Sequence, residues 1–357
     1  MDILSVVHLA AEKKASDVHI VASNPPLFRI RGAMQLVADM PPLTPDDIEQ
    51  ALQQITSEEQ RAVFERDLEL DFGYTVPGVG RIRGNAAKQR GTTTIAIRLL
   101  PSVVPSLEQL GLPEVCKELI LKPRGMVVVS GPTGSGKSTT LSAMINYLNA
   151  TQSRRLVTIE DPIEFVYTNN KCTITQRELG GDTKSFAEAL RHVLRQDPDV
   201  ILVGEMRDLE TASAALTIAE TGHLILTTGH APSAPQTIER IMDMFPPYER
   251  ATVQSRLASL LIGVLCQALV PTVDGKGRVA AIEVMLASPA VRANIRDGKV
   301  YQIPNVMLTQ ARMGMMLLDH ALVNFYRKGV ISRERVLEFC NDQDEVAKLM
   351  GGGVGQI

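Results

Sequence analysis

The ten residues 131–140 carry the strongest chemical signal in the chain. They read Gly-Pro-Thr-Gly-Ser-Gly-Lys-Ser-Thr-Thr, the complete G-x-x-x-x-G-K-[ST] pattern of a phosphate-binding loop. Glycines allow the backbone to wrap a phosphate chain with its N–H groups turned inward, and the helix that follows such a loop adds its positive end. The segment therefore predicts a binding site for a nucleoside triphosphate.

The flanking sequence fits this prediction, because residues 126–129 have the composition of a strand and residues 141–148 that of a helix. Lys137 is expected to reach the β- and γ-phosphates of ATP, and the Ser138 hydroxyl to bind Mg²⁺. The predicted nucleotide-binding residues of the loop are Gly131, Pro132, Thr133, Gly134, Ser135, Gly136, Lys137, Ser138 and Thr139.

A first acidic cluster follows the apolar run 156–159 and reads Glu-Asp-Pro-Ile-Glu over residues 160–164. A carboxylate beside a triphosphate is suited to orienting and deprotonating the attacking water. The segment alone also fits a solvated turn with the Asp161-Pro162 pair at its corner. Beside a phosphate-binding loop we interpret it as catalytic, with Glu164 or Glu160 as the base.

A second acid, Glu205, comes directly after the apolar run 200–203 and Gly204. A buried strand that runs into an acid can present this carboxylate to Mg²⁺, in part through water. Many such strands end in Asp-Glu, whereas Gly204 stands here in the position of the aspartate, so Glu205 is expected to serve the metal alone. The residues that follow, beginning with Asp208, indicate a helix start.

Two histidines, His223 and His230, bracket a segment that begins with the apolar run 224–226. In one extended strand, seven steps of ~3.3 Å separate His223 from His230 by roughly 23 Å, so they cannot share a metal ion. His230, at the carboxyl end, is placed to sense the γ-phosphate. His223 is a second candidate contact to the nucleotide, and a structural role for either histidine remains the alternative.

Arginines can stabilise the charge that spreads over phosphoryl oxygens in the transition state. Arg81, Arg83 and Arg98 lie on strand-like segments where they could share a face, and we expect them to reach the nucleotide. Arg207, close to Glu205 in sequence, is a further candidate contact.

The elements that must position these residues fall into two regions. Residues 1–100 read as a small α+β domain, and residues 101–112, which begin with a proline-rich stretch, as a linker. Residues 113–357 alternate short apolar strands with helices, which indicates a mostly parallel sheet covered on both faces. Ligands of such sheets collect at the carboxyl ends of the strands. From about residue 255 onward we expect mainly helices.

Composition excludes several classes of protein. A net charge of −3 gives no global basic field for nucleic acid, and four scattered cysteines form no C-x-x-C pair for a zinc site. The longest apolar stretch, residues 260–270, is interrupted by Gln267 and is too short to span a bilayer. No cleavable signal pattern is visible. We therefore expect a cytoplasmic protein without a transmembrane segment, which reaches a membrane only through partners.

The motifs together resemble the secretion and pilus motor ATPases, and within them the motors that retract type IV pili. The resemblance covers nearly the whole chain and rests on residues 15–19, 25–32, 81–85, 131–140, 158–165, 197–211 and 221–230. It implies a PAS-like N-terminal domain, a RecA-like C-terminal domain and a hexameric ring with ATP and Mg²⁺ at the interdomain cleft. It also implies an inner-membrane platform protein as partner, no stable binding of nucleic acid and, by analogy, a preference for Glu164 as the base.

Two departures keep alternatives open. The histidine box reads Thr-Gly-His-Ala-Pro over residues 228–232, and the segment 290–297, Ala-Val-Arg-Ala-Asn-Ile-Arg-Asp, has drifted from a family motif tied to retraction. A divergent accessory motor and an extension or secretion motor are therefore alternatives. A nucleic-acid translocase and a scaffold that binds ATP without hydrolysing it come from other functional classes.

Overall fold

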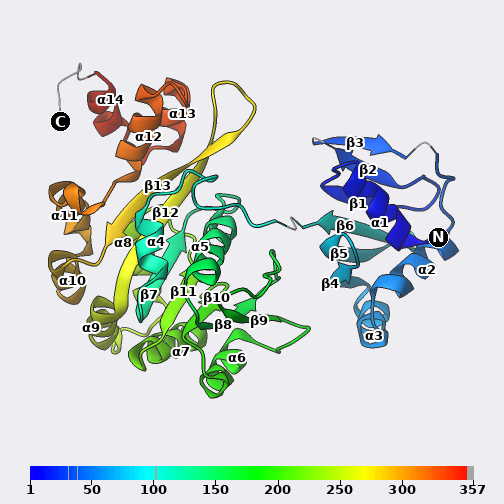
Figure 1. Ribbon diagram of the computed structural model, residues 1–357, viewed down its shortest axis with the longest axis horizontal. Coiled ribbons are helices and arrows are strands. Elements are labelled where there is room, and N and C mark those ends of the chain that lie inside the picture. The colour runs from blue at the N-terminus through cyan, green and yellow to red at the C-terminus, as the bar shows by residue number, and fades with distance from the viewer. Residues whose placement is uncertain (31, 38, 101–102, 352–357) are drawn as a thin grey trace. The chain divides into compact units, whose positions relative to one another are not determined.

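The computed structural model describes residues 1–30, 32–37, 39–100 and 103–351 (Figure 1). The chain divides into two compact units. The first comprises Met1–Val103 with the segment Pro162–Val166, and the second comprises Val104–Asp161 and Tyr167–Ile357. The division after Val103 falls inside the predicted linker 101–112, of which residues 101 and 102 lie outside the described residues.

Within its described residues the first unit forms a six-stranded antiparallel sheet in the order β3-β2-β1-β6-β5-β4. The strands are β1 (Asp17–Ile20), β2 (Leu27–Ile30), β3 (Ala33–Leu36), β4 (Glu69–Val76), β5 (Gly80–Gln89) and β6 (Thr92–Leu99). The helices α1 (Ile3–Glu12), α2 (Pro45–Ile55) and α3 (Glu58–Asp67) pack on one face. Alternation along β5, where Ile82 is buried and Arg81 and Arg83 are not, gives the sheet one apolar and one polar face.

Capping boxes open two helices of this unit. The Thr44 side chain accepts from the Asp47 amide at the start of α2, and Ser57 accepts from the Gln60 amide at the start of α3, with reciprocal bonds back to each cap. Each box satisfies N–H groups that have no partner inside the helix. The starts of α2 and α3 are therefore fixed by residues three positions apart in the sequence.

The second unit is built on a seven-stranded sheet, counted over the described part of the chain, in the order β13-β12-β7-β11-β10-β8-β9. Its strands are β7 (Gly125–Ser130), β8 (Arg155–Glu160), β9 (Thr173–Glu178), β10 (Val200–Val203), β11 (Leu224–Thr228), β12 (Leu261–Pro271) and β13 (Arg278–Leu286). All neighbours are parallel except β12 and β13. The predicted mostly parallel α/β sheet is confirmed.

Helices cover both faces of this sheet (Figure 1). Successive residues of each strand point to opposite faces, so each strand contributes apolar side chains to both layers of helices. On β7, Val127 and Val129 pack with α4 (Val115–Ile120) and α5 (Lys137–Thr151). Met126 and Val128 pack on the other side. The helices there are α6 (Phe186–Val193), α7 (Leu209–Glu220), α8 (Ala234–Asp243), α9 (Arg250–Leu260), α10 (Pro289–Arg296) and α11 (Ile303–Thr309).

The expectation of mainly helices from about residue 255 is wrong for residues 261–286. That region forms the hairpin of β12 and β13, the edge of the sheet next to β7. The apolar run 260–270 is buried on both faces and shows no period that separates a strand from a buried helix. Helices do follow it. Three of them, α12 (Leu318–Arg327), α13 (Arg333–Phe339) and α14 (Gln343–Gly351), pack on the far part of the hairpin (Figure 1).

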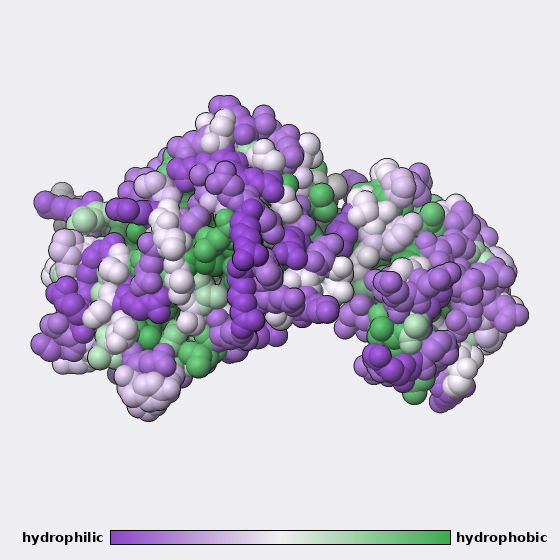
Figure 2. All heavy atoms as spheres, turned by 90° about the horizontal axis from the view of Figure 1, so that it is seen from below, coloured by the Kyte–Doolittle hydropathy of each residue, from purple (hydrophilic) through white to green (hydrophobic). Residues whose placement is uncertain are grey.

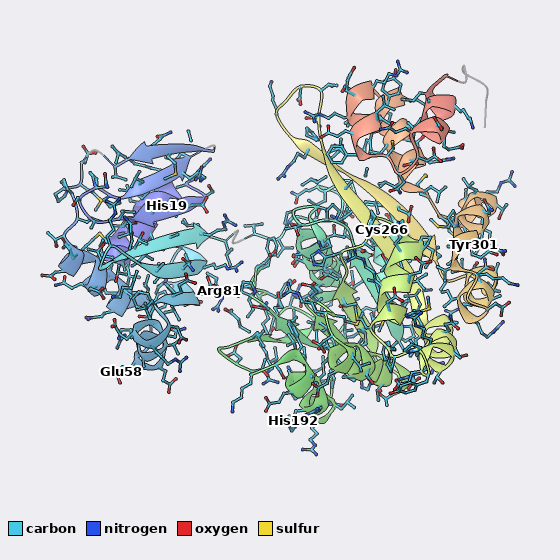
Figure 3. The ribbon with its side chains drawn as sticks, turned by 180° about the vertical axis from the view of Figure 1, so that it is seen from behind. His19, Glu58, Arg81, His192, Cys266 and Tyr301 are labelled. Carbon is cyan, nitrogen blue, oxygen red and sulfur yellow. The ribbon has the colours of Figure 1, made fainter. Side chains whose placement is uncertain are left out.

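The surface of the molecule seen in Figure 2 is mostly hydrophilic, with smaller apolar areas between polar ones. The four cysteines are free thiols, and burial raises the pKa of Cys116 to about 12. In the interior, Cys266 lies on β12 within the second unit (Figure 3). Over the described residues, no helix is both long and apolar enough to cross a bilayer.

Candidate nucleotide site

The phosphate-binding loop connects β7 to α5, as the sequence predicts. Its glycines Gly131, Gly134 and Gly136 have φ of 138°, 79° and 89°, conformations that other residues adopt only with strain. Gly131 also lies against another strand, since a Cβ there would overlap the main-chain oxygen of Gln267 on β12. Both backbone conformation and space therefore require glycine at position 131.

The first turn of α5 is arranged as an anion site. Its N-cap is Gly136, which offers no side-chain acceptor, whereas α6, α7 and α8 begin with serine or aspartate caps. The first N–H groups of a helix have no partner within it, and here the Thr140 amide is the first to bond back, to the Gly136 carbonyl at 3.0 Å. Uncapped N–H groups at a positive helix end favour a bound phosphate.

Lys137 lies folded into the loop and is only 9% exposed. Its Nζ donates to the carbonyl oxygens of Gly131 at 2.8 Å and Pro132 at 3.0 Å. These contacts hold a buried ammonium group beside the amides that would receive phosphate. The residues on the rim, 132–134, are exposed.

Glu205 and His230 lie together at the carboxyl ends of the parallel strands, where the phosphate loop also begins. β10 and β11 are parallel to β7, so the residues that follow them emerge where the loop begins. His230 Nε2 lies 3.0 Å from Glu205 Oε1, and Arg207 binds the other carboxylate oxygen at 2.7 Å. Burial disfavours the charged form of Glu205, but Arg207 and His230 outweigh it and hold the pKa of this carboxyl below its ordinary value. The group is thus an anion at neutral pH.

Short hydrogen bonds fix the segments that carry these side chains. Ser130 Oγ, at the end of β7, donates to the Ala231 carbonyl at 2.8 Å and accepts from the Ala231 amide at 2.9 Å. Thr228 Oγ1 donates to the Gly204 carbonyl at 2.5 Å. The histidine loop is therefore tied both to the phosphate-loop strand and to the segment before Glu205.

Gly204 has a packing reason to replace the usual aspartate. Its amide donates to the Ile159 carbonyl at 2.8 Å, and a Cβ would lie 3.2 Å from that oxygen and 3.4 Å from the Glu160 Cα. Contacts of 3.2 Å are tighter than van der Waals packing allows without adjustment. A larger side chain would press on the end of β8.

The two glutamates of the first acidic cluster lie in different surroundings. Glu160 ends β8 and is 9% exposed, and its Oε1 accepts from Thr158 Oγ1 at 2.6 Å and Gln176 Nε2 at 3.2 Å. Glu164 is exposed and belongs to the segment that groups with the first unit. Sequence reasoning missed Glu178, a buried acid on β9 whose Cα pairs in register with that of Glu160.

The structure does not bring His223 to the phosphate loop of the same chain. It precedes β11, and its carbonyl accepts from the Gly125 amide at the start of β7, the opposite end from the loop. Its Nδ1 lies 2.9 Å from Thr221 Oγ1 and 3.1 Å from the Ile218 carbonyl. In this position the His223 side chain caps the C-terminal end of α7.

The arginines of the first unit share its polar face. Arg83 and Arg98 are directly opposite each other on β5 and β6, and Arg81 is two residues from Arg83 (Figure 3 labels Arg81). Arg98 also binds Asp17 on β1 at 2.9 Å. Burial disfavours ionised Asp17, but hydrogen bonds from Ser16 and Arg98 keep the pKa of this carboxyl below its ordinary value.

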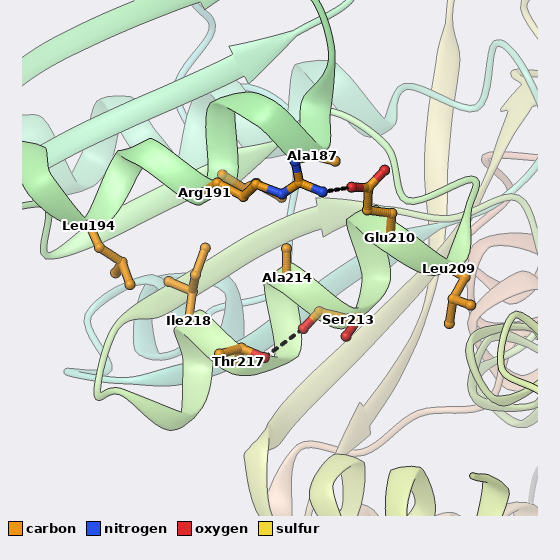
Figure 4. A pocket seen from close by; sticks show the side chains of 10 residues that line it. Ala187, Arg191, Leu194, Leu209, Glu210, Ser213, Ala214, Thr217 and Ile218 are labelled. Atoms are coloured by element: carbon orange, nitrogen blue, oxygen red, sulfur yellow. Dashed lines mark hydrogen bonds and ion pairs between the residues drawn. The ribbon is translucent and has the colours of Figure 1, made fainter. Parts of the chain in front are cut away.

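Among the hollows in the described part of the second unit, two lie near the helices and strands that follow the loop. One, of about 220 Å³, is lined by Glu205, Arg207 and His230 together with Arg240 and Thr237, so it continues the acidic site. The other, of about 540 Å³, is a groove between α6 and α7 (Figure 4). Its charged groups Arg191 and Glu210 bind each other, so the groove offers no charge for phosphate chemistry.

The donor set fits a magnesium ion that is shared with a phosphate chain. Over the described residues no group of three or more His, Cys, Asp or Glu side chains is placed to hold a metal by itself. Mg²⁺ is typically bound by one or two protein oxygens, substrate phosphates and water. Ser138, half-buried at the start of α5, and the ionised Glu205 are the oxygens that would hold it.

A phosphate loop between strand and helix of a parallel sheet, with an acid and a histidine at the same edge, is the arrangement of the P-loop class of proteins. Residues 2–349 match the family of Type II/IV secretion system proteins, and the chain belongs to this family. The sequence resemblance to secretion and pilus motors is thereby confirmed.

Individual relatives cover almost all of the chain. The type IV pilus retraction ATPase PilT of Pseudomonas aeruginosa is 47% identical over 95% of this chain and 98% of its own length. The type IV pilus ATPase PilU of the same organism is 40% identical over 97% and 90%. A crystal structure of the pilus retraction motor PilT with bound ADP superposes with a TM-score of 0.92 at 43% identity, over 98% of this chain and 99% of that one.

Proposed function

We propose that the protein is an ATP-hydrolysing motor that powers retraction of type IV pili. The observation that carries the proposal is the convergence of the loop 131–140 and the Glu205–His230 pair at one edge of one sheet. The match to a retraction ATPase and a retraction-motor structure over nearly the full chain supports pili as the target.

Binding of ATP falls to the loop. The amides of residues 134–138 and the positive end of α5 surround the phosphates, and Lys137 exchanges its two carbonyl partners for phosphate oxygens. Ser138 and Glu205 would hold Mg²⁺, which would supply positive charge to the phosphates. Arg207 and His230 keep Glu205 ionised for this role.

Hydrolysis needs a base that is free to take a proton from water. Glu164 suits this role better than Glu160, because Glu164 is exposed whereas both Thr158 and Gln176 donate to the buried Glu160 carboxylate. His230, held at 3.0 Å from Glu205, is placed to report the presence of the γ-phosphate to α8, which begins three residues after Ala231.

We further propose a PAS-like domain for residues 1–100 and a RecA-like domain for residues 113–357, joined by the linker 101–112. The α+β build of the first unit and the parallel sheet of the second support this assignment. Arg83 and Arg98 lie opposite each other on β5 and β6, where like charges repel, and within the described part of the chain Asp17, which binds Arg98 at 2.9 Å, makes no such contact with Arg83. This pairing supports Arg81, Arg83 and Arg98 as nucleotide contacts in a hexameric ring.

In such a ring, closing of the two domains on ATP and reopening after hydrolysis would convert chemistry into rotation. The work would act on an inner-membrane platform protein at the pilus base. The motor would therefore be cytoplasmic and peripheral to the inner membrane, without stable binding of nucleic acid.

Deletion of the gene tests the direction of the motor. Excess surface pili that do not retract, together with loss of twitching motility, are expected for a retraction motor. Cells without pili would contradict the proposal and indicate an extension motor. Complementation with the Lys137→Ala variant should leave the deletion phenotype unchanged.

An accessory motor of the PilU kind is the second candidate, since PilU matches nearly as much of the chain. The segment 290–297 that departs from the retraction motif lies within and just after α10. An accessory motor would fail to retract pili when every other pilus ATPase that could retract them is deleted, whereas a full retraction motor would retract them.

A further inference from the structure

We propose that Gln267 is a positioning residue that holds the phosphate loop in the shape required for ATP binding. The inference rests on the proposed function and extends it to a residue outside the phosphate-binding motif. Gln267 is the amide that interrupts the otherwise apolar run of β12, and only 3% of its surface is exposed.

Both ends of its side-chain amide bind the loop and its helix. Nε2 donates to the main-chain carbonyl of Ser135 at 2.5 Å, and Oε1 accepts from Thr140 Oγ1 at 2.9 Å. Thr140 lies in the first turn of α5, and Ser135 precedes the two residues that open it. One buried side chain therefore spans from the glycine-rich turn to the helix.

The backbone of Gln267 also limits where the loop can move. Its main-chain oxygen lies against Gly131 at the start of the loop, and its Nε2 lies 3.1 Å from the position of a Cβ on Gly136. The contacts of Gln267 with Gly131, Ser135 and Thr140 fix the beginning, the middle and the end of residues 131–140 relative to β12. A loop fixed in this way loses little conformational freedom when phosphate binds.

Strand β12, which carries Gln267, also contacts the C-terminal helices. Ala268 and Val270, close to Gln267 on the same strand, pack in one apolar cluster with residues of α12, α13 and α14. Strand β12 is paired along its length with β13. The same strand therefore contacts both the phosphate loop and the C-terminal helices.

Loss of the amide would leave a buried carbonyl and a buried hydroxyl without partners, so the loop would relax. The expected effect is weaker nucleotide binding with a smaller change in chemistry, because Gln267 is not expected to touch the reacting atoms. We expect the Kd for ADP and the KM for ATP to rise at least ~10-fold, which corresponds to ~1.4 kcal/mol, while kcat falls less than ~3-fold.

The test uses the full chain and three variants. Gln267→Met keeps the volume and removes both hydrogen bonds, Gln267→Glu keeps only the acceptor, and Thr140→Val removes the donor to Oε1. Gln53→Met, on the exposed surface of α2, is the matched control. Fluorescent ADP titration, steady-state ATPase kinetics and thermal unfolding without nucleotide are measured for each.

The inference predicts weakened ADP binding for both Gln267 variants in chains that still unfold in one cooperative transition. Thr140→Val should add nothing to Gln267→Met in the double variant, because the two residues act through one contact. Nucleotide affinity within twofold of wild type in Gln267→Met, or additive effects in the double variant, would overturn it. A wild-type chain that binds no nucleotide would instead refute the proposed function, and this inference with it.

Discussion

His230 Nε2 lies 3.0 Å from Glu205 Oε1, although the two residues follow different strands of the sheet. The parallel register of β10 and β11 brings them together, and Thr228 fixes the spacing through its bond to the Gly204 carbonyl. The carboxylate that would serve Mg²⁺ is therefore in direct contact with the side chain that would sense the γ-phosphate. Any change in the charge of one group is felt by the other.

Replacing Arg207 with alanine should shift the acid limb of ATP hydrolysis to higher pH. Arg207 helps to hold the pKa of Glu205 below its ordinary value, and hydrolysis needs the ionised form. Without Arg207 the pKa rises toward its usual range, so activity is lost at a higher pH as the solution is acidified. Profiles of kcat/KM against pH for wild type, Arg207→Ala and Arg207→Lys measure this. An acid limb that does not move in Arg207→Ala would argue against this role.

Replacing Lys137 with alanine should reduce ATP hydrolysis below detection and weaken ATP binding strongly. The variant removes the buried ammonium group from the centre of the loop and leaves the loop glycines in place. Phosphate release and calorimetric titration with ATP are the measurements. Lys122→Ala, at an exposed position before β7, is the control and should behave as wild type. Full activity in Lys137→Ala would contradict the site.

Replacing Glu164 with glutamine should lower kcat at least ~100-fold and leave ATP binding intact, as expected for loss of a general base. Glu160→Gln should act differently, because Glu160 is buried and accepts bonds from Thr158 and Gln176. There we expect a lower unfolding temperature with a smaller loss of kcat. If Glu160→Gln stops turnover and Glu164→Gln does not, the two roles must be exchanged.

Replacing Glu283 with glutamine should change how stability depends on pH. Glu283 is buried on β13 and accepts from the amides of Ala234 at 2.6 Å and Leu318 at 3.3 Å, the first residues of α8 and α12. Burial raises the pKa of this carboxyl, so in the window above its ordinary value the folded chain keeps a proton that the unfolded chain has lost. Stability then falls as pH rises through that window.

The Glu283→Gln variant cannot titrate at this position, so it lacks this source of pH dependence. As pH rises above the ordinary pKa of a glutamate, wild type should lose unfolding free energy relative to the variant. Urea unfolding of both chains at several pH values measures it. A difference that stays constant at these pH values would show that Glu283 does not titrate in the fold.

Sequence reasoning succeeded where the signal is local. The loop 131–140 is flanked in the sequence by the strand before it and the helix after it, and both are observed. The short apolar strands β8, β10 and β11 are each bounded by polar residues. Such patterns depend on backbone preferences that neighbours in the chain determine.

Sequence reasoning failed where the role of a residue depends on a contact with a residue far away in the sequence. Gln267 was visible only as a polar break in an apolar run, and its partner Ser135 is 132 residues away in the sequence. Buried polar groups are nearly always hydrogen-bonded, so an amide side chain within an apolar strand indicates that it binds some partner. The partner could not be named without knowing that β12 pairs with β7.

The most direct test of the account is a structure with a non-hydrolysable ATP analogue and Mg²⁺. We predict that the phosphates lie within hydrogen-bonding distance of Lys137 Nζ and the amides of residues 134–138, with Glu205 and His230 facing the terminal phosphate. A nucleotide bound elsewhere, or Glu205 and His230 turned away from it, would contradict the central claim that this edge of the sheet is the site of ATP hydrolysis.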